Sequence, residues 1–468
     1  MTAARVEPGS FRDPHSRVFT TDNGVLRTLS PEGLADWEAF AATDLFPRLV
    51  AEGKLIETER VNGDADLPAE LREGAAGVLR HERIPFVSYP YEWPFGMLRE
   101  AALLQLELLE AALAEDLILK DSSPYNVQWR GTQPVFIDTG SFERLPPGEP
   151  WIGYRQFCML FLYPLLLQAY KNVPFQPWLR GSIDGITPQQ CRSLMSFRDL
   201  FRRGVFTHVY LHSRLDRSPK ETAGDVKREL RAAGFKKELI VANVGRLTKL
   251  FRRLEWNRDP STWSEYGVTT SYSEEDAARK EEFVRAALGT RRWNLAWDVG
   301  CNVGRFARIA AENARYVVAL DADAGVVEQL YRALAEESSA SILPLVVNVV
   351  DPSPGIGWRG TERRTLADRG SPDVTLCLAL IHHVAIRGNV PVRDFVDWLA
   401  SLETALVIEF PTRDDPQVQR LLAAKREDLH ADYDRDWFER CLRDAFDVER
   451  SEALDSGNRI LYFARPKA

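Results

Sequence analysis

Cysteine is scarce in this chain of 468 residues, and none of its five cysteines stands in a CxxC spacing. A scattered and odd set of thiols argues against a disulfide framework and against a zinc site, and it is typical of a reducing compartment. We therefore expect a cytoplasmic protein without a structural metal. The five residues are Cys158, Cys191, Cys301, Cys377 and Cys441.

Long apolar runs are also missing. The longest, from Phe157 to Tyr170, is interrupted by Pro164 and is too short to span a bilayer, so it predicts a buried helix. The first residues contain no apolar segment of the kind that a signal peptide needs. Internal repeats and low-complexity tracts are absent too. We therefore expect no membrane span.

An excess of positive charge is absent as well, because the formal net charge is -8. That balance does not favour nucleic-acid binding. The stretch 201–255 is an exception, with fourteen Lys and Arg residues against six Asp and Glu residues. It is either the solvated basic face of a helical linker or a docking site for an anionic partner.

The length of the chain predicts two domains, since a single core rarely grows to this size. We divide the chain into a loose leader (1–16), an α+β domain (17–215), a basic helical linker (216–262) and an α/β domain (263–468). The α+β domain is expected to contain strands at Arg17–Thr20, Val25–Leu29 and Phe86–Tyr89, a helix at Pro31–Val50 with Ser30 as its N-cap, and a long helix at Met97–Ala114.

The C-terminal domain alternates short apolar runs with helical patterns, which is typical of a doubly wound parallel sheet. Its last two strands, Asp447–Leu454 and Arg459–Ala464, are joined by a turn that contains glycine, and they predict a closing hairpin. The strands expected before this hairpin are Leu295–Trp297, Tyr316–Leu320, Ile342–Val350, Val374–Leu380 and Ala405–Phe410.

A ligand-binding turn is predicted between the first strand and the first helix of this sheet. The glycines of DVGCNVG (residues 298–304) let the backbone approach a ligand, and their GxxxG spacing lacks the tight cradle that a dinucleotide pyrophosphate needs. Acidic and amide side chains follow the next two strands, where they can reach a ribose and an adenine amino group. The candidate cofactor-binding residues are Asp298, Gly300, Asn302, Gly304, Asp321, Asn348 and Asp351.

DVGCNVG, YVVALDAD (316–323) and the acid after the third strand resemble, in this order, the motifs of class I S-adenosylmethionine-dependent methyltransferases. The resemblance implies a Rossmann-like sheet, S-adenosylmethionine (SAM) as cofactor, and methyl transfer. Asn302 stands where many members carry a glycine, which is a common variation. The residues that the resemblance assigns to SAM are Gly300, Gly304 and Asp321, with Asn348 or Asp351 at the adenine.

Two histidines end the fourth strand, at the edge where ligands sit in an open α/β sheet. Histidine has an unperturbed pKa that suits proton transfer, so His382 or His383 is a candidate general base. Packing, or orientation of the methyl acceptor, is the alternative role. Glu409, at the end of the fifth strand, points at the same crevice and is a further catalytic candidate that could take the proton. A third ligand for a two-histidine metal site is not evident, so we predict no metal.

Two further segments border this crevice. The loop 351–358 contains two prolines and two glycines and ends at Trp358, and it is either a lid over the substrate or a rigid surface loop. Tyr272 and Lys280 precede the first strand and are placed to fold over the cofactor.

The N-terminal domain contains a second pattern, because Asp121 and Asn126 stand five residues apart and Asp138 follows 12 residues later. This order resembles the catalytic loop and the metal-binding Asp of kinase-like folds, in which Asp121 would be the base and the other two would hold magnesium for ATP. A Gly-rich phosphate loop is missing and Arg27 is the basic residue placed to replace the strand Lys. We therefore expect a kinase outline without useful phosphate transfer; turn residues in an unrelated helical domain are the alternative.

Two more stretches, VFIDTGSFE (135–143) and LALIHHVAI (378–386), resemble bacterial two-domain methyltransferases related to a rhizobial nodulation protein. The sequence thus predicts a SAM-dependent methyltransferase that acts on an oxygen or nitrogen atom of a small molecule, sugar or natural-product intermediate. The N-terminal domain would bind the substrate or a partner. A bifunctional kinase and methyltransferase, and a non-catalytic interaction protein with vestigial enzyme folds, remain alternatives.

Overall fold

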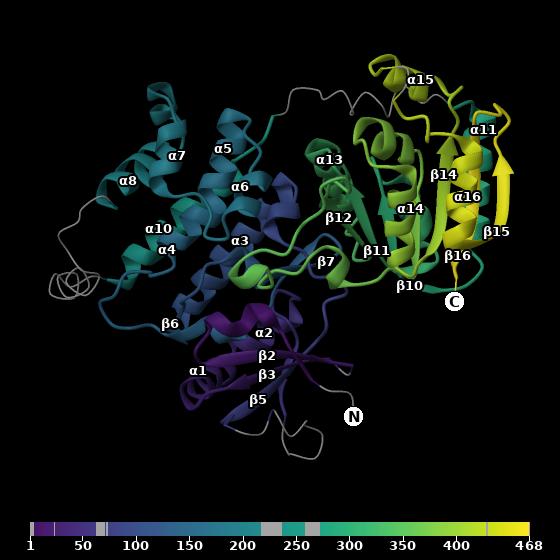
Figure 1. Cartoon of the computed structure of the whole chain (residues 1–468). Helices are drawn as coiled ribbons and strands as arrows, with labels where there is room; N and C mark the ends of the chain where they lie inside the picture. The colour runs from purple at the N-terminus through teal and green to yellow at the C-terminus, as the bar shows by residue number, and fades with distance from the viewer. Residues whose placement is uncertain are drawn as a thin grey trace. The chain divides into compact units, whose positions relative to one another are not determined.

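The computed structural model describes residues 4–22, 24–61, 71, 74–216, 236–257, 272–426 and 429–467 (Figure 1). By their contacts these residues form two units. Unit 1 comprises Met1–Trp129, Pro134–Arg258 and Gly355–Arg363, and unit 2 comprises Arg130–Gln133, Asp259–Pro354 and Arg364–Ala468. Much of the expected linker 216–262 lies outside the described residues.

Unit 1 opens with an antiparallel sheet in the strand order β1-β2-β3-β5-β4, drawn in purple to blue in Figure 1. Residues 5–12, expected as part of a loose leader, hold the edge strand of this sheet and a 3-10 turn. The strands are β1 (Arg5–Val6), β2 (Ser16–Thr21), β3 (Gly24–Leu29), β4 (Thr58–Arg60) and β5 (Gly77–His81).

Helices dominate the rest of unit 1, together with two short strand pairs. The long helix α3 is confirmed and is buried along most of its length. The helices are α1 (Pro31–Ala41), α2 (Leu45–Ala51), α3 (Phe95–Ala114), α4 (Tyr154–Phe157), α5 (Tyr163–Lys171), α6 (Gln176–Gly181), α7 (Pro188–Leu194), α8 (His212–Leu215) and α10 (Lys237–Arg252). The pairs are β6 (Leu117–Leu119) with β9 (Phe142–Arg144), and β7 (Val127–Arg130) with β8 (Gln133–Phe136).

The prediction of one helix over Pro31–Val50 is wrong. Ser30 does cap its start, since the backbone N–H of Gly33 donates to the Ser30 hydroxyl at 3.1 Å. The helix nevertheless ends at Ala41, and α2 begins only at Leu45. The cause is Pro47, because a proline lacks the N–H and its ring would clash with the carbonyl of residue 43 in a continuous helix.

The strand predicted at Phe86–Tyr89 is also wrong. At Ser88 a side chain takes the place of a neighbouring strand: the Gln128 amide donates to the Ser88 carbonyl and accepts from the Ser88 N–H, both at 2.9 Å. A buried amide that pairs with one residue in this way satisfies its backbone groups without a strand ladder.

The apolar run 157–170 is a buried helix, as expected. It consists of a π-helical turn, Cys158–Leu162, followed by α5. Within the described residues, no helix is both long and apolar enough to cross a membrane.

Unit 2 is built on a sheet of seven described strands in the order β12-β11-β10-β13-β14-β16-β15 (green to yellow in Figure 1). The first five strands are parallel and β16 is antiparallel to β14, so the doubly wound sheet and its closing hairpin are confirmed. The strands are β10 (Trp293–Val299), β11 (Ala314–Asp321), β12 (Ile342–Val346), β13 (Val374–Cys377), β14 (Ala405–Pro411), β15 (Phe446–Ala453) and β16 (Arg459–Pro466).

Helices cover both faces of this sheet. One apolar core joins α11, α12 and α13 to the sheet, and a second joins α14 and α16 to it. The helices are α11 (Glu274–Leu288), α12 (Arg305–Ala311), α13 (Ala324–Glu336), α14 (Val392–Ser401), α15 (Pro416–Ala423) and α16 (Arg435–Ala445).

Two strands of the sheet end earlier than predicted. β12 stops at Val346 because the Asn348 side chain accepts the backbone N–H of Val350 at 3.1 Å and closes a turn. β13 stops at Cys377, and Ala379 then adopts a left-handed conformation with φ of 51°. The histidine pair therefore lies in a helical turn that follows the strand, not in the strand itself.

Candidate functional site

The carboxyl end of β10 carries the predicted ligand turn, at the point where the chain order of the sheet reverses between β10 and β13. Gly300, Asn302 and Gly304 all have positive φ, at 79°, 49° and 78°. Glycine is favoured at Gly304 because of this positive φ, and a Cβ atom there would also lie 2.5 Å from the Leu330 side chain. Asn302 tolerates its conformation because its own side-chain oxygen accepts the N–H of Val303 at 2.7 Å.

Asp321 ends β11 and faces this turn. One carboxylate oxygen accepts the N–H of Asn302 at 3.0 Å, and the other accepts the N–H of Asp323 at 2.9 Å. Burial raises the pKa of Asp321, although these backbone bonds oppose the shift. The carboxylate is thus held in one orientation beside the glycine turn before any ligand arrives.

Asp298 is the penultimate residue of β10, and its side chain is 2% exposed. Its Oδ2 atom has no hydrogen-bond partner among the described residues. Burial, together with the negative charge of Asp321, raises the pKa of Asp298 to about 7. A buried carboxyl group with one unfilled oxygen is suited to a ligand that brings a positive charge or a hydrogen-bond donor.

Asn348 and Asp351 follow β12 and are both exposed. The Asn348 side chain is occupied by the turn that ends β12, and its carbonyl accepts the N–H of Asp351 at 3.0 Å. The turn leaves both residues accessible at the carboxyl end of the strand.

Glu409, in β14, lies in a buried ionic network. Lys280 of α11 donates to it at 2.6 Å, and Arg459 of β16 lies 3.3 Å from its other oxygen. Burial alone would raise the pKa of Glu409, but the two cations outweigh it and lower the pKa. Glu409 is therefore an ionised, fully engaged carboxylate.

Tyr272 and Asp415 complete this network. The Tyr272 hydroxyl donates to Glu409 at 2.7 Å and accepts from Lys280 at 2.9 Å, and Arg459 also donates to it. Asp415 accepts from Arg459 at 2.7 Å. The sequence drew attention to Tyr272, Lys280 and Glu409, but not to Asp415 or Arg459; a lone arginine that begins the apolar strand RILYFA was the available signal.

His382 and His383 lie in the turn that follows β13, with ring centroids 4.1 Å apart. His382 is 1% exposed, and its Nδ1 atom has no hydrogen-bond partner among the described residues. Burial, then the neighbouring His383 and the cations Arg459 and Lys280, keep the pKa of His382 well below its usual range. Burial also lowers the pKa of His383, to about 4. Both rings are therefore neutral at physiological pH.

The kinase-like residues of unit 1 are close together, but one of them is already paired. Arg27 of β3 donates to one oxygen of Asp138 at 2.6 Å, and the Ser141 hydroxyl donates to the other at 2.5 Å. Burial and the charge of Asp138 raise the pKa of Asp121. Neither the Oδ1 atom of Asp121 nor the amide nitrogen of Asn126 has a hydrogen-bond partner among the described residues.

This arrangement does not fit a magnesium ion, because both oxygens of Asp138 are taken by protein donors. The described part of the chain contains no group of three or more His, Cys, Asp or Glu side chains that could hold a metal ion. Lys54, the only lysine before Lys120, instead bonds Glu107 at 2.6 Å and Glu52 at 2.8 Å.

The segment Gly355–Arg363, which includes the second half of the loop expected to be a lid, belongs to unit 1. Its Glu362 side chain is fully buried and accepts two bonds from Arg12, at 2.6 and 2.9 Å. The Arg363 guanidinium lies 4.2 Å from the centre of the Tyr125 ring. Trp358 is 65% exposed. The sequence showed no sign of this anchoring, since Arg12 and Glu362 are 350 residues apart.

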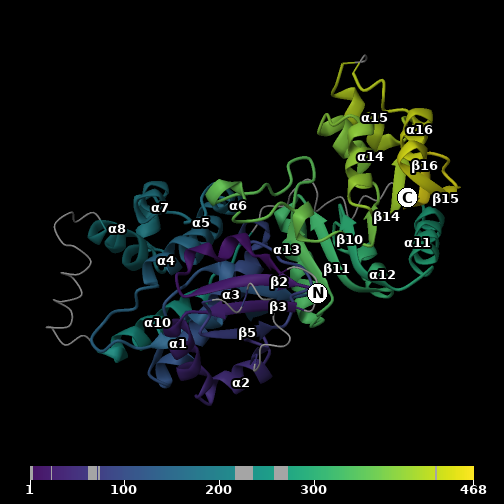
Figure 2. The same cartoon turned by 60° about the horizontal axis from the view of Figure 1, so that its bottom comes forward.

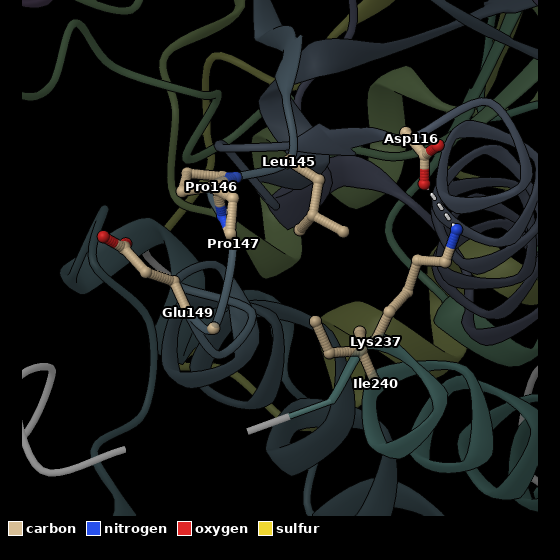
Figure 3. Close-up of a pocket in the computed structure, with 8 residues that line it drawn as sticks. Asp116, Leu145, Pro146, Pro147, Glu149, Lys237 and Ile240 are labelled. Atoms are coloured by element: carbon tan, nitrogen blue, oxygen red, sulfur yellow. Dashed lines mark hydrogen bonds and ion pairs between the residues drawn. The ribbon is translucent and has the colours of Figure 1, made fainter. Parts of the chain in front are cut away.

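Unit 1 also contains a cavity of about 360 Å³, which Figure 3 shows in close-up. An ion pair of 2.6 Å between Lys237 and Asp116 closes one side, and none of the lining residues is a predicted site residue. The lining residues are Asp116, Leu145, Pro146, Pro147, Gly148, Glu149, Lys237 and Ile240.

Comparison with known proteins gives one relative that spans nearly the whole chain. It is nodulation protein NoeA of Rhizobium meliloti (strain 1021), which is 32% identical over 457 residues, covering 97% of this chain and 94% of NoeA. No protein-family model matches the chain.

Similar solved structures include the N-methyltransferase NodS of Bradyrhizobium japonicum WM9, with 11% identity, 42% of this chain and 99% of that chain covered, and a TM-score of 0.31. Another is the magnesium protoporphyrin IX methyltransferase of Synechocystis PCC 6803 with bound SAM, with 18% identity, 46% and 90% coverage, and a TM-score of 0.29.

Proposed function

This chain belongs to the family of nodulation protein NoeA, and we propose that it is a SAM-dependent methyltransferase that binds SAM at the carboxyl ends of β10 and β11. The observation that carries the proposal is the pair of buried carboxyl groups, Asp298 and Asp321, on either side of a glycine turn. Asp298 keeps one buried oxygen without a partner, and Asp321 is fixed toward the turn.

The site fits the chemistry of SAM better than that of a dinucleotide. SAM carries a cationic sulfonium and an ammonium group, which match two buried acids, and a ribose diol, which a carboxylate at the end of the second strand can accept. A dinucleotide would bring a diphosphate toward the same two acids and would need backbone donors that the looser turn does not provide. Asn348 and Asp351 are the residues we assign to the adenine.

When bound, SAM supplies an electrophilic methyl group, and the protein must orient the acceptor and take up its proton. We assign the proton to His383, whose neutral ring is only partly buried. His382 would position that ring, since the two lie 4.1 Å apart. Glu409 is a positioning residue in this scheme and not a base, because Lys280 and Arg459 hold it ionised.

The acceptor is proposed to be an oxygen or nitrogen atom of a small molecule, sugar or natural-product intermediate. The net charge of -8 supports a small acceptor over a nucleic acid. We further propose that unit 1 binds this acceptor or a partner. The ion pair between Arg27 and Asp138 argues against phosphate transfer by this unit.

The proposal is tested by titration calorimetry with S-adenosylhomocysteine (SAH), the product that SAM leaves behind. Asp321→Ala should weaken SAH binding by about tenfold or more, since a hydrogen bond to a charged group contributes about 1.5–3 kcal/mol. Asp373→Ala is the matched control, because Asp373 also accepts two backbone N–H groups, those of Asn294 and Leu295, but at the amino end of the sheet.

The control variant should bind SAH like the wild type. If the wild-type protein binds neither SAM nor SAH, the proposal is wrong and a non-catalytic interaction protein becomes the better reading. Equal losses in both variants would also contradict it, since they would reflect damage to the sheet and not loss of a ligand contact.

A further inference from the structure

Unit 1 exposes an unusual number of large apolar side chains between α7 and α8. They occur on η7 (Phe197–Phe201), a 3-10 helix, on η8 (Val205–Leu211), a π-helix, and on α8. Isolated exposed apolar residues are common, but a dense group of them marks an interaction site. The exposed residues are Phe197 (76%), Phe201 (81%), Phe206 (50%), Leu211 (39%) and Leu215 (77%).

These side chains are grouped in space. The rings of Phe197 and Phe201 meet edge to face at 5.9 Å, and Phe206 stacks on Tyr210 at 5.8 Å. η7, α7 and α8 all contact η8. α7 and α8 lie side by side at the edge of unit 1 in both Figure 1 and Figure 2. The apolar group therefore forms one region of unit 1 and not a set of scattered positions.

Exposed arginines occur on or directly beside the same elements. Arg198, Arg202, Arg203 and Arg214 are all exposed. Within the described residues Arg202 pairs with Asp199 at 3.2 Å, whereas no ion pair of Arg198 or Arg203 is found there. We call these four arginines, with Phe197, Phe201, Phe206, Leu211 and Leu215, the η7–α8 surface.

The acids beside these arginines do not neutralise the surface. Asp199 is buried and bonds Lys171 at 2.9 Å, as well as the Ser196 hydroxyl at 2.7 Å. Asp216 bonds Arg155 at 3.0 Å and Gln189 at 2.9 Å. Asp216 thus serves residues outside the η7–α8 surface, and Asp199 is shared between Lys171 and Arg202. The surface therefore keeps an excess of positive charge, although the net charge of the chain is -8.

We propose that the η7–α8 surface docks on an anionic phospholipid membrane. Exposed Phe and Leu side chains enter the boundary between headgroups and acyl chains, and arginines beside them bind the headgroup phosphates. The leucines argue against a nucleic acid, because they offer no ring for a base to stack on. Docking on a second copy is disfavoured, since a two-fold interface would bring the same arginines against each other.

The test uses the full-length protein and co-sedimentation with vesicles of phosphatidylcholine, prepared with or without phosphatidylglycerol. Binding is expected only to vesicles that contain phosphatidylglycerol, and it should weaken as salt is added. Phe197→Ser/Phe201→Ser should weaken vesicle binding by about tenfold or more, because it removes two inserting rings. Arg198→Ser/Arg203→Ser should weaken it by a similar factor and remove the preference for phosphatidylglycerol.

Leu429→Ser is the matched control, because Leu429 is 45% exposed but lies in unit 2. It should bind vesicles like the wild type. All variants should keep SAH affinity, which separates this inference from the proposed methyltransferase activity. The inference is overturned if the wild-type protein does not co-sediment with vesicles that contain phosphatidylglycerol. It is equally overturned if the two phenylalanines are needed for single-stranded RNA binding, or for self-association in gel filtration, and not for vesicle binding.

Discussion

Two aspartates of this protein, the half-buried Asp138 and the buried Asp298, have opposite surroundings. Asp138 in unit 1 has both oxygens filled by the protein, one by Arg27 and one by Ser141. Asp298 in unit 2 leaves its Oδ2 atom without a partner among the described residues. Burial acts on both carboxyl groups, but Arg27 outweighs it and lowers the pKa of Asp138, whereas the pKa of Asp298 rises to about 7.

The difference shows where the chain retains capacity for a ligand. A buried carboxylate that is neutralised internally adds little further attraction for a cation, whereas one that is not neutralised becomes more stable when a cation or donor arrives. Unit 2 therefore has the features of a binding site at Asp298, and unit 1 has those of an internally paired site at Asp138.

Replacing a histidine of the pair should give the largest effect, a loss of methyl-transfer turnover. This replacement tests whether the site in unit 2 that can bind a ligand also carries out proton transfer. His383→Gln should lower methyl-transfer turnover by about 10²–10⁴-fold if His383 takes the proton, while SAH affinity stays unchanged. Because the pKa of His383 is about 4, the wild-type turnover should fall only in strongly acidic buffer.

Single-turnover kinetics of the wild type, His382→Gln and His383→Gln decide this point. A positioning role for His382 predicts a smaller loss of turnover in its variant. Near-normal rates in both variants would mean that the pair only packs or orients, and that the proton leaves to water.

Lys280→Met should give the next largest effect, since it removes one partner of a buried ion pair. Loss of such a partner costs about 3–5 kcal/mol of folding stability, and the remaining contact between Glu409 and Arg459 places the expected loss near the lower value. Urea unfolding of unit 2 measures it.

The matched control for Lys280→Met is Arg393→Ala, which removes an exposed pair with Asp444 at 2.7 Å. Exposed pairs contribute little, so the control should unfold at nearly the wild-type urea concentration. A small loss of folding stability in both variants would mean that the ionic network around Glu409 does not stabilise unit 2.

The pH dependence of SAH binding should show a smaller effect. The ammonium group of SAH is attracted by the ionised form of Asp298, whose pKa lies at about 7. SAH affinity should thus be highest above pH 7 and fall by up to about tenfold for each pH unit below it. Asp298→Asn should bind SAH more weakly and lose this dependence. If the wild-type affinity for SAH does not change between pH 8 and pH 6, the claim that the carboxyl group of Asp298 contacts the ligand is wrong.

The smallest expected effect belongs to unit 1. Given magnesium and ATP, the full-length protein should incorporate no more phosphate than an Asp121→Ala variant. The sequence has no Gly-rich phosphate loop with its partner lysine, and Asp138 is already paired with Arg27. Radiolabelled ATP provides the measurement. Phosphorylation that depends on Asp121 would break the comparison between the units and favour a bifunctional enzyme.

The sequence alone determined the parts of this protein that depend on neighbours along the chain. The doubly wound sheet follows from alternating apolar runs, and the ligand turn from glycines that the backbone requires at Gly300 and Gly304. The role of Ser30 as a cap also follows from its place before a helix. In each case the residues that interact lie within a few positions of each other, so their spacing encodes the structure.

Only the tertiary structure decided how distant residues satisfy one another. Arg459 lies 50 residues from Glu409, Arg12 lies 350 residues from Glu362, and Arg27 lies 111 residues from Asp138. No local sequence pattern predicts such pairs. A charged side chain needs a partner only once it is buried, and the packing of the chain decides which residue becomes that partner. Packing places Lys280 and Arg459 beside Glu409, so this carboxylate is neutralised and is not the base that the sequence suggested. Asp298, two strands away, keeps an oxygen that has no partner among the described residues.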